Sequence, residues 1–262
     1  KKLLLRVNCG SQMHLEHQIE YEAYTLKLME GSGRTPKVLY ADGSKKILDH
    51  GVLVMEYLPG HTMDYHTELM LAAPCLADIH SVQIPESEEV LIHPQNPLKA
   101  ILKECEEMFK VYLESPLGDE EKKIYIRELL DLGWKREAET RLESGYQCCI
   151  NTELNSTNFL INGEGKSNYL IDWEKPLFGN PAQDLGHFLA PTTTFWKTDV
   201  ILTSEEMEKF IDAYTKAVGN RFKTDMIREH THAFIPITCL RGITWCAMAW
   251  VQYQQPDKLI FN

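Results

Sequence analysis

Residues 149–174 hold the side chains that could do chemistry together. Within this stretch, residues 159–161 (FLI) and 169–171 (YLI) are short apolar segments separated by Asn-Gly turn chemistry, so we expect them to pair as a hairpin. Asn158 directly precedes the first segment and Asp172 directly follows the second. An amide oxygen and a carboxylate therefore meet at the open end of the hairpin, and Mg²⁺ accepts both as ligands. The sequence predicts a Mg²⁺ site at Asn158 and Asp172.

Glu153 stands five residues before Asn158, in the loop that enters the same place. An acid, an Asn five residues later and an Asp beyond a hairpin form the layout of a kinase catalytic loop and its metal-binding Asp. Taken alone, such a Glu is more often an ordinary surface group of a loop. Together with the hairpin and the sequence GNPAQD at residues 179–184, it favours a nucleotide and metal site.

Three sequence blocks in combination carry a family resemblance. They read NTELNSTN at residues 151–158, IDWE at residues 171–174 and GNPAQDLG at residues 179–186. With these blocks the chain resembles the aminoglycoside phosphotransferase and choline kinase group of kinase-like enzymes, whose blocks usually read HGDLxxxN, IDWE or IDFE, and GDPxxDLA. Two positions depart from that pattern: Asn151 replaces the usual His, and Glu153 replaces the usual catalytic Asp.

The resemblance extends to the first part of the chain and implies nucleotide contacts there. Arg6 sits where the family places the strand base that reaches the nucleotide phosphates, and Glu22 matches the helix Glu that pairs with this base. Glu20 is the lower-ranked alternative to Glu22. Residues 52–60 match the hinge strand of the family. The adenine contacts that this match implies come from the backbones of Glu56 and Leu58, with the side chain of Met55 beside the ring.

A small mixed lobe and a larger helical lobe are needed to position these residues. Apolar patterning predicts strands at residues 3–7, 37–40 and 52–57, and helices at residues 15–29, 68–81, 99–114, 120–143, 204–218 and 227–254. We therefore expect an α+β, two-lobed protein-kinase-like fold, with a nucleotide-binding lobe at residues 1–60 and a helical lobe at residues 61–262. The family's phosphate-covering loop precedes the strand of Arg6, so the first lobe is expected to lack it.

Four aromatic residues in the last third of the chain are candidates for an acceptor pocket, namely Trp196, Trp245, Trp250 and Tyr253. The last three spread around one predicted helix, so some of them must belong to the core. The acidic net charge and the tryptophans favour a cationic or amino-alcohol acceptor, choline-like or aminoglycoside-like. The alternative is a neutral sugar, recognised by the hydroxyl groups of residues 192–194.

The composition narrows the possible partners. A net charge of −11 argues against a nucleic-acid partner, whose phosphates require a basic face. No apolar run reaches the roughly 18 residues that span a bilayer, and no signal peptide is visible, so no membrane partner is expected. The seven cysteines are scattered and form no C-x-x-C pair, which favours a reducing compartment and a cytoplasmic location. The sequence gives no indication of an oligomeric state.

The sequence thus predicts a small-molecule kinase that transfers the γ-phosphoryl group of ATP, or of GTP, to a hydroxyl group of a metabolite such as choline, an aminoglycoside, or another amino alcohol or sugar. Asn158 and Asp172 would hold Mg²⁺, Arg6 would steady the phosphates, and Glu153 would accept or orient the hydroxyl proton. The alternative is a pseudokinase, a non-catalytic nucleotide-binding module, and the departures at Asn151 and Glu153 are its evidence.

Overall fold

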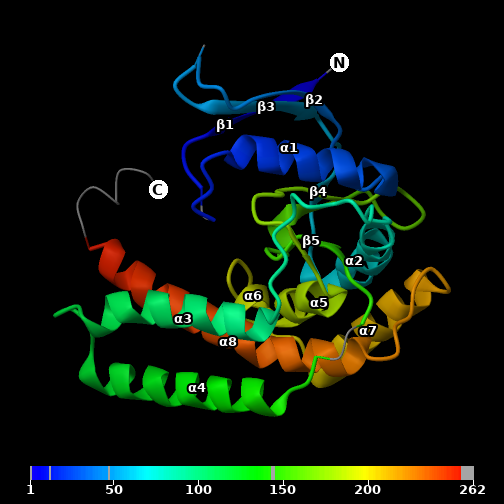
Figure 1. Ribbon diagram of the computed structural model, residues 1–262. Coiled ribbons are helices and arrows are strands. Elements are labelled where there is room, and N and C mark those ends of the chain that lie inside the picture. The colour runs from blue at the N-terminus through cyan, green and yellow to red at the C-terminus, as the bar shows by residue number, and fades with distance from the viewer. Residues whose placement is uncertain (1, 12, 47, 143–144, 255–262) are drawn as a thin grey trace.

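The computed structural model describes residues 2–11, 13–46, 48–142 and 145–254. Its first part is an antiparallel sheet of β1 (Leu3–Asn8), β3 (Gly51–Glu56) and β2 (Val38–Asp42), in that order, with α1 (Gln18–Met29) lying along one face (Figure 1). A single 3₁₀ turn, η1 (Glu30–Ser32), follows α1. The central strand β3 is the most buried of the three, which agrees with its apolar sequence.

The middle of the chain contains the predicted hairpin. Strand β6 (Phe159–Ile161) pairs antiparallel with β7 (Tyr169–Leu170), and β4 (His61–Thr62) adds a third strand on the other side of β6. Gly163 and Gly165 adopt positive φ angles in the turn, a conformation that glycine takes without steric cost. A separate two-stranded sheet, β5 (Cys148–Ile150) with β8 (Leu177–Gly179), lies beside this hairpin and was not predicted.

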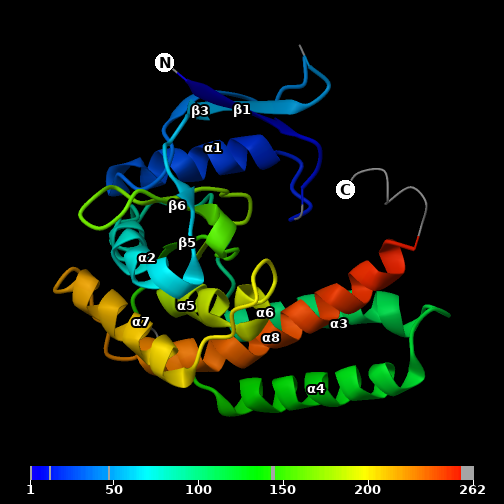
Figure 2. The same ribbon diagram turned by 180° about the vertical axis from the view of Figure 1, so that it is seen from behind.

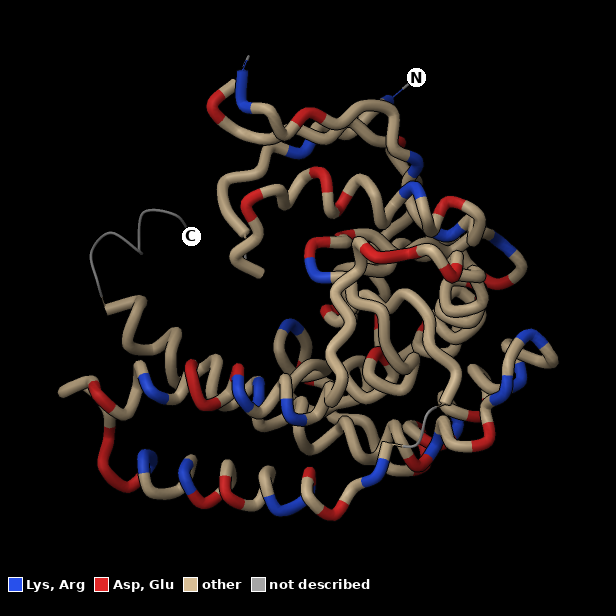
Figure 3. Tube along the Cα trace, in the orientation of Figure 1, with Lys and Arg blue, Asp and Glu red and all other residues tan. Residues whose placement is uncertain are grey.

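The remainder is helical. The helices are α2 (Tyr65–His80), α3 (Pro97–Leu113), α4 (Glu120–Glu139), α5 (Pro181–Leu189), α6 (Pro191–Thr194), α7 (Ser204–Val218) and α8 (Ile227–Gln252). Figure 2 shows α3, α4 and α8 together at the base of the molecule, below the sheets. Acidic and basic residues are interspersed along α3 and α4, as expected of helices with a solvated face (Figure 3). The α+β class predicted from the sequence, with the sheets in the first part and a mainly helical remainder, is confirmed.

Several predicted boundaries shift, and capping residues explain most of the shifts. Helix α2 begins three residues earlier than predicted because the Asp64 carboxylate accepts the backbone N–H of His66. Helix α7 keeps its predicted bounds, and Thr203 caps it in a capping box with Glu206. Helix α1 begins later than predicted, since the chain turns at His14, which has a φ of 55°. The predicted end of the fourth helix at residue 143, and everything after residue 254, lie outside the described residues.

Helix α8 is the structural centre of the helical part. By length and composition this helix is apolar enough to cross a membrane, but it packs against α3, α5 and α6, as the core helix of a soluble domain also would. Two glycines permit its close contacts. A Cβ added at Gly242 would lie 2.8 Å from Cβ of Thr192 in α6, and one added at Gly186 of α5 would lie 2.4 Å from Cβ of Phe234. These close approaches place the middle of α8 directly beneath the loops that carry the candidate site.

Candidate active site

The hairpin brings Asn158 and Asp172 together as the sequence predicts. The backbone N–H of Ile171 donates to the carbonyl oxygen of Asn158 at 2.8 Å, so the residue after Ile171 lies next to Asn158. The Asn158 Nδ2 donates to the backbone oxygen of Glu153 at 3.0 Å, which directs its Oδ1 away from that loop. Asp172 adopts a φ of 64°, a left-handed conformation that costs a non-glycine residue about 1–2 kcal/mol and recurs at functional sites.

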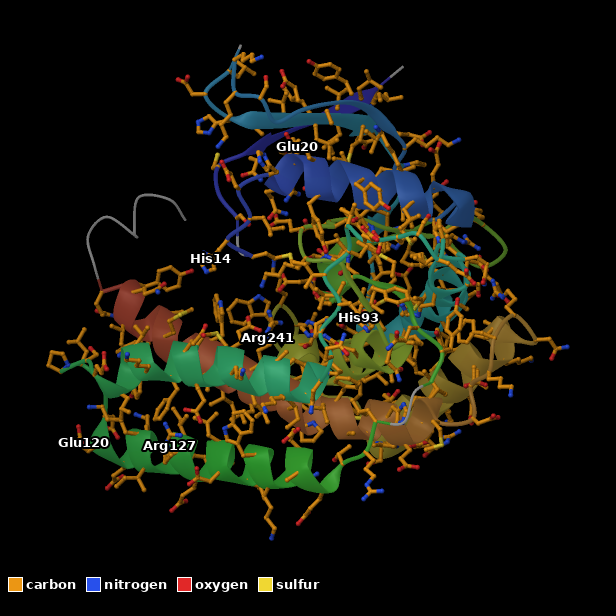
Figure 4. The ribbon with its side chains drawn as sticks, in the orientation of Figure 1. His14, Glu20, His93, Glu120, Arg127 and Arg241 are labelled. Atoms are coloured by element: carbon orange, nitrogen blue, oxygen red, sulfur yellow. The ribbon has the colours of Figure 1, made fainter. Side chains whose placement is uncertain are left out.

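Arg6 joins this centre to the first sheet. Its guanidinium contacts three carboxylates at once. Nη1 lies 3.1 Å from Oδ1 of Asp172, Nε lies 3.1 Å from Oε2 of Glu22, and Nη2 donates to Oε1 of Glu174. The structure therefore places Arg6 against Glu22, as the family resemblance implies, and also against the predicted metal ligand. Glu20 is exposed on the side of α1 that faces the sheet, where its carboxylate lies beside Gly43 and not at Arg6 (Figure 4).

Glu22 is almost completely buried, with only 1% of its surface exposed. Burial raises the pKa of its carboxyl group to about 7, because the attraction of Arg6 only partly offsets the loss of hydration. Its Oε2 lies within ion-pair distance of Arg6 but receives no well-directed hydrogen bond from the described residues. The raised pKa therefore has a physical cause: the charged form of Glu22 loses its hydration on burial, and the ion pair with Arg6 does not fully replace it.

This burial predicts a pH-dependent stability. The pKa of Glu22 in the folded protein lies above its ordinary value of 4.5. Its contribution to the free energy of unfolding is therefore complete below pH 4.5 and is lost as the pH rises through 7. The side chain of Glu22→Gln cannot ionise, so the melting temperature of this variant should fall less between pH 4.5 and 8. In the wild type, full ionisation of Glu22 should lower the free energy of unfolding by about 3 kcal/mol. Glu20→Gln, on the exposed face of the same helix, should leave the profile unchanged. Identical profiles for Glu22→Gln and the wild type would contradict this assignment.

A buried aspartate braces the catalytic loop. Asp184 is fully buried and accepts the backbone N–H groups of Asn151 at 2.8 Å and Thr152 at 2.7 Å. The His80 Nε2 lies 3.2 Å from the same carboxylate. These bonds hold Thr152 at a φ of 68°, where a β-branched residue is strained. Asp184 therefore braces the start of the loop that carries Glu153.

Asn151, which replaces the family's His, connects the loop to the metal-site strand. Its Nδ2 donates to the backbone oxygen of Asp172 at 2.8 Å, and its Oδ1 accepts the backbone N–H of Glu153 at 3.1 Å. Both ends of one amide thus hold the loop in register with Asp172. The departure from the family pattern leaves the arrangement of the loop intact.

Glu153 lies between two cations. Lys175 Nζ is 2.9 Å and Arg241 Nη2 is 3.2 Å from the same oxygen, Oε1 of Glu153. Arg241 also makes two hydrogen bonds to Glu104 of α3, at 3.0 and 3.1 Å. Burial alone would raise the pKa of Glu153, but Lys175 and Arg241 outweigh it and hold the pKa below its ordinary value. Glu153 is therefore ionised at neutral pH, and its second oxygen, Oε2, remains to receive a hydroxyl proton.

Sequence reasoning missed Lys175, Arg241 and Glu104. Arg241 carried a signal, since it is a lone charge in the apolar sequence ITCLRGITW, and such residues are seldom buried without a partner. Figure 4 labels it where α8 and α3 face the loops in the middle of the molecule. Glu104 looked like one acid among several on an amphipathic helix. Its pairing with Arg241 spans 137 residues and has no local signature.

A cleft of about 720 Å³ opens beside Glu153. It lies between α6, the segment that follows α6, and one face of α8. Two of the four aromatic candidates line it: the rings of Trp196 and Trp245 meet edge to face, with their centroids 4.8 Å apart. Trp250 is 58% exposed and, like Tyr253, does not line this cleft. Among residues 192–194, Thr192 and Thr193 line it, while the hydroxyl of Thr194 donates to the backbone oxygen of Val200.

The predicted hinge residues lie at the end of β3. Met55 is buried, and Glu56 is paired with Leu3 of β1. The backbone N–H of Glu56 donates to the carbonyl oxygen of Lys37. The hinge role of Met55, Glu56 and Leu58 stays a prediction.

The donors present fit Mg²⁺. Magnesium in kinases is bound by one or two protein oxygen ligands together with water and substrate phosphates, rather than by an all-protein cage. Asn158 and Asp172 offer such a pair, and no group of three His, Cys, Asp or Glu side chains among the described residues would compete as a metal cage. Burial raises the pKa of Asp172, an effect that Arg6 opposes and that a bound cation would also oppose.

Fold and site together define a kinase-like phosphotransferase. A sequence model of the phosphotransferase enzyme family matches residues 1–228, and the chain belongs to that family. Among curated proteins, none matches the sequence.

Solved structures with a similar fold come from the same class. A choline/ethanolamine kinase family protein from Mesorhizobium loti is 16% identical with a TM-score of 0.65, over 97% of this chain and 75% of that one. Plasmodium vivax ethanolamine kinase is 16% identical with a TM-score of 0.66, over 98% and 72%. An AMP-bound spectinomycin phosphotransferase is 14% identical with a TM-score of 0.64, over 98% and 81%. At these identities the likeness establishes the kinase-like fold.

Proposed function

We propose that this phosphotransferase moves the γ-phosphoryl group of ATP, or of GTP, to a hydroxyl group of a small metabolite in the presence of Mg²⁺. One observation carries the proposal: Glu153 connects the two halves of the site. Its backbone oxygen accepts from Asn158 at the metal-site hairpin, while its side chain lines the cleft of about 720 Å³. A group at this junction can contact an acceptor hydroxyl beside the place where a metal-bound phosphate would lie. The AMP bound to the similar spectinomycin enzyme supports nucleotide use.

Each residue has a defined task in this proposal. Asn158 and Asp172 would hold Mg²⁺, which when bound neutralises charge on the phosphates. Arg6 would steady the phosphates from residues 1–60, the proposed nucleotide lobe, and Glu22 would orient Arg6. Glu153 would accept or orient the hydroxyl proton through Oε2. The loose transition state leaves the protein mainly positioning and charge stabilisation to perform.

Mg·ATP is expected to stabilise the protein. Binding to the native state alone adds RT ln(1 + [L]/Kd), about 2.7 kcal/mol at a hundredfold excess over Kd, so millimolar Mg·ATP or Mg·GTP should raise the melting temperature by several degrees. Asp172→Asn should lose the Mg²⁺-dependent part of the rise. Asp131→Asn, an exposed change on α4, is the control and should keep it. A wild-type protein that melts at the same temperature with and without either nucleotide would refute the nucleotide site.

A further inference from the structure

The charged groups in and beside the acceptor cleft are already paired with one another. Glu153 is the only acid among the described residues that line it, and Lys175 and Arg241 both contact its Oε1. Arg241 is in turn paired with Glu104 of α3. The charges alternate along this row of four contacting side chains and sum to zero, in the order Lys175, Glu153, Arg241 and Glu104. An ammonium group entering the cleft would meet two cations and no unpaired carboxylate, and burying a charge without a counter-charge is costly.

The aromatic wall does not form a cage. A quaternary ammonium is held when several aromatic faces surround it. Here the rings of Trp196 and Trp245 are perpendicular, at 89°, and in contact, so the edge of one ring covers a face of the other. This arrangement leaves aromatic surface for one flat ring to stack against, rather than a set of faces around a cation. The face of a sugar ring that carries C–H groups is slightly positive and can stack on such an aromatic surface.

The rest of the lining donates and accepts hydrogen bonds without charge. Thr192, Thr193 and Thr238 contribute hydroxyl groups, and Asn155 contributes an amide. A volume of about 720 Å³ falls within the range of pockets that hold drug-sized ligands, so the cleft has room for a ring and its substituents. Uncharged hydroxyls are the ligand groups that this lining can pair.

We propose, on the basis of the proposed kinase function, that the acceptor is an uncharged, ring-containing polyol such as a neutral sugar or glycoside. Its ring stacks on the Trp196–Trp245 pair, and its hydroxyls bond to the threonines, with one hydroxyl directed at Oε2 of Glu153. This replaces the cationic acceptor that net charge and tryptophan content favoured in the sequence. The net charge of −11 is a property of the whole chain, whereas this cleft is lined by one acid and two cations, and Glu104 beside it balances the second cation.

Matched pairs of ligands test the proposal, because each pair differs mainly in charge. The pairs are D-glucose with D-glucosamine, D-galactose with D-galactosamine, and 3,3-dimethylbutan-1-ol with choline. Binding is measured by equilibrium dialysis and by tryptophan fluorescence, without nucleotide, and transfer is measured separately with Mg·ATP. We expect a neutral sugar to bind at least about tenfold more tightly than its amine, equivalent to about 1.4 kcal/mol. Tighter binding of the amine in every pair, or no binding by any ligand at 10 mM, would overturn the proposal of a neutral acceptor.

Lys175→Met provides the matched variant. Removing one of the two cations leaves Glu153 with uncompensated negative charge, so binding of the amine should improve at least about fivefold relative to the neutral partner. Lys209→Met removes a lysine from an exposed ion pair with Glu205 on α7 and should leave the ratio of amine binding to neutral-ligand binding unchanged. An unchanged ratio in Lys175→Met would overturn the role of the balanced charges. Neutral-selective binding without phosphoryl transfer would instead sink the proposed kinase function and leave the binding preference standing.

Discussion

Replacing Asp172 with Asn should lower kcat by about 10³-fold or more, because a metal ion contributes several kcal/mol of charge stabilisation in such reactions. Asn is the informative substitution here. It keeps the shape of the side chain, and it tolerates the left-handed conformation that Asp172 adopts at a φ of 64°. The variant should therefore fold, while the site loses its one carboxylate ligand and the negative charge that this ligand offers to Mg²⁺.

The measurement is steady-state transfer at several Mg²⁺ concentrations. A lost ligand predicts a higher Mg²⁺ requirement as well as a lower maximal rate, whereas general damage to the fold would not shift the requirement. Asp131→Asn should behave as the wild type. Activity of Asp172→Asn within about tenfold of the wild type, at the same Mg²⁺ requirement, would remove Asp172 from the metal site.

Glu153→Gln is the second large effect, and it separates an enzyme from a nucleotide-binding module. Loss of a positioned proton acceptor should lower kcat by roughly 10²–10⁴-fold. The KM for ATP should change little, since Glu153 is proposed to contact the acceptor and not the nucleotide. A pseudokinase would show no such effect, having no turnover to lose.

Glu153→Asp sharpens this test because Asp is the usual residue of the family at this position. In this chain Oε1 is held by Lys175 and Arg241, at 2.9 and 3.2 Å, so the surroundings are built for the longer side chain. Shortening it by one methylene should break both contacts and displace the carboxylate by about 1 Å, which can cost roughly 10²-fold. We therefore expect Asp to lower activity. A gain of activity would mean that the loop is still shaped for Asp and that the two cations do not position Glu153.

Local sequence chemistry predicted the hairpin that brings Asn158 and Asp172 together. The hairpin follows from an Asn-Gly turn between two apolar segments, and a hairpin must bring its flanks together, so Asn158 and Asp172 could be placed beside each other without a structure. In contrast, the start of α2 was missed because Asp64 caps it ahead of the apolar pattern.

The acceptor side could not be predicted because its contacts are long-range. Glu104, Glu153 and Arg241 come from a helix, a loop and another helix, and only the packing of α8 against α3 makes them neighbours. Strands β5 and β8 were missed for the same reason, as each is three residues long and pairs across 26 intervening residues or more. The cancellation of charge in the cleft is likewise invisible to a count of charges along the chain.

The central claim is that a phosphoryl group moves from nucleotide to a hydroxyl of a small molecule. The most direct measurement is ³¹P NMR of the wild type with Mg·ATP and the neutral sugars above, beside Asp172→Asn and Glu153→Gln. The account predicts loss of the γ-phosphate signal and growth of a phosphomonoester signal in equal amount, in the wild type alone. Nucleotide that binds but remains intact with every acceptor, or yields only ADP and inorganic phosphate at a rate that no acceptor changes, would contradict it.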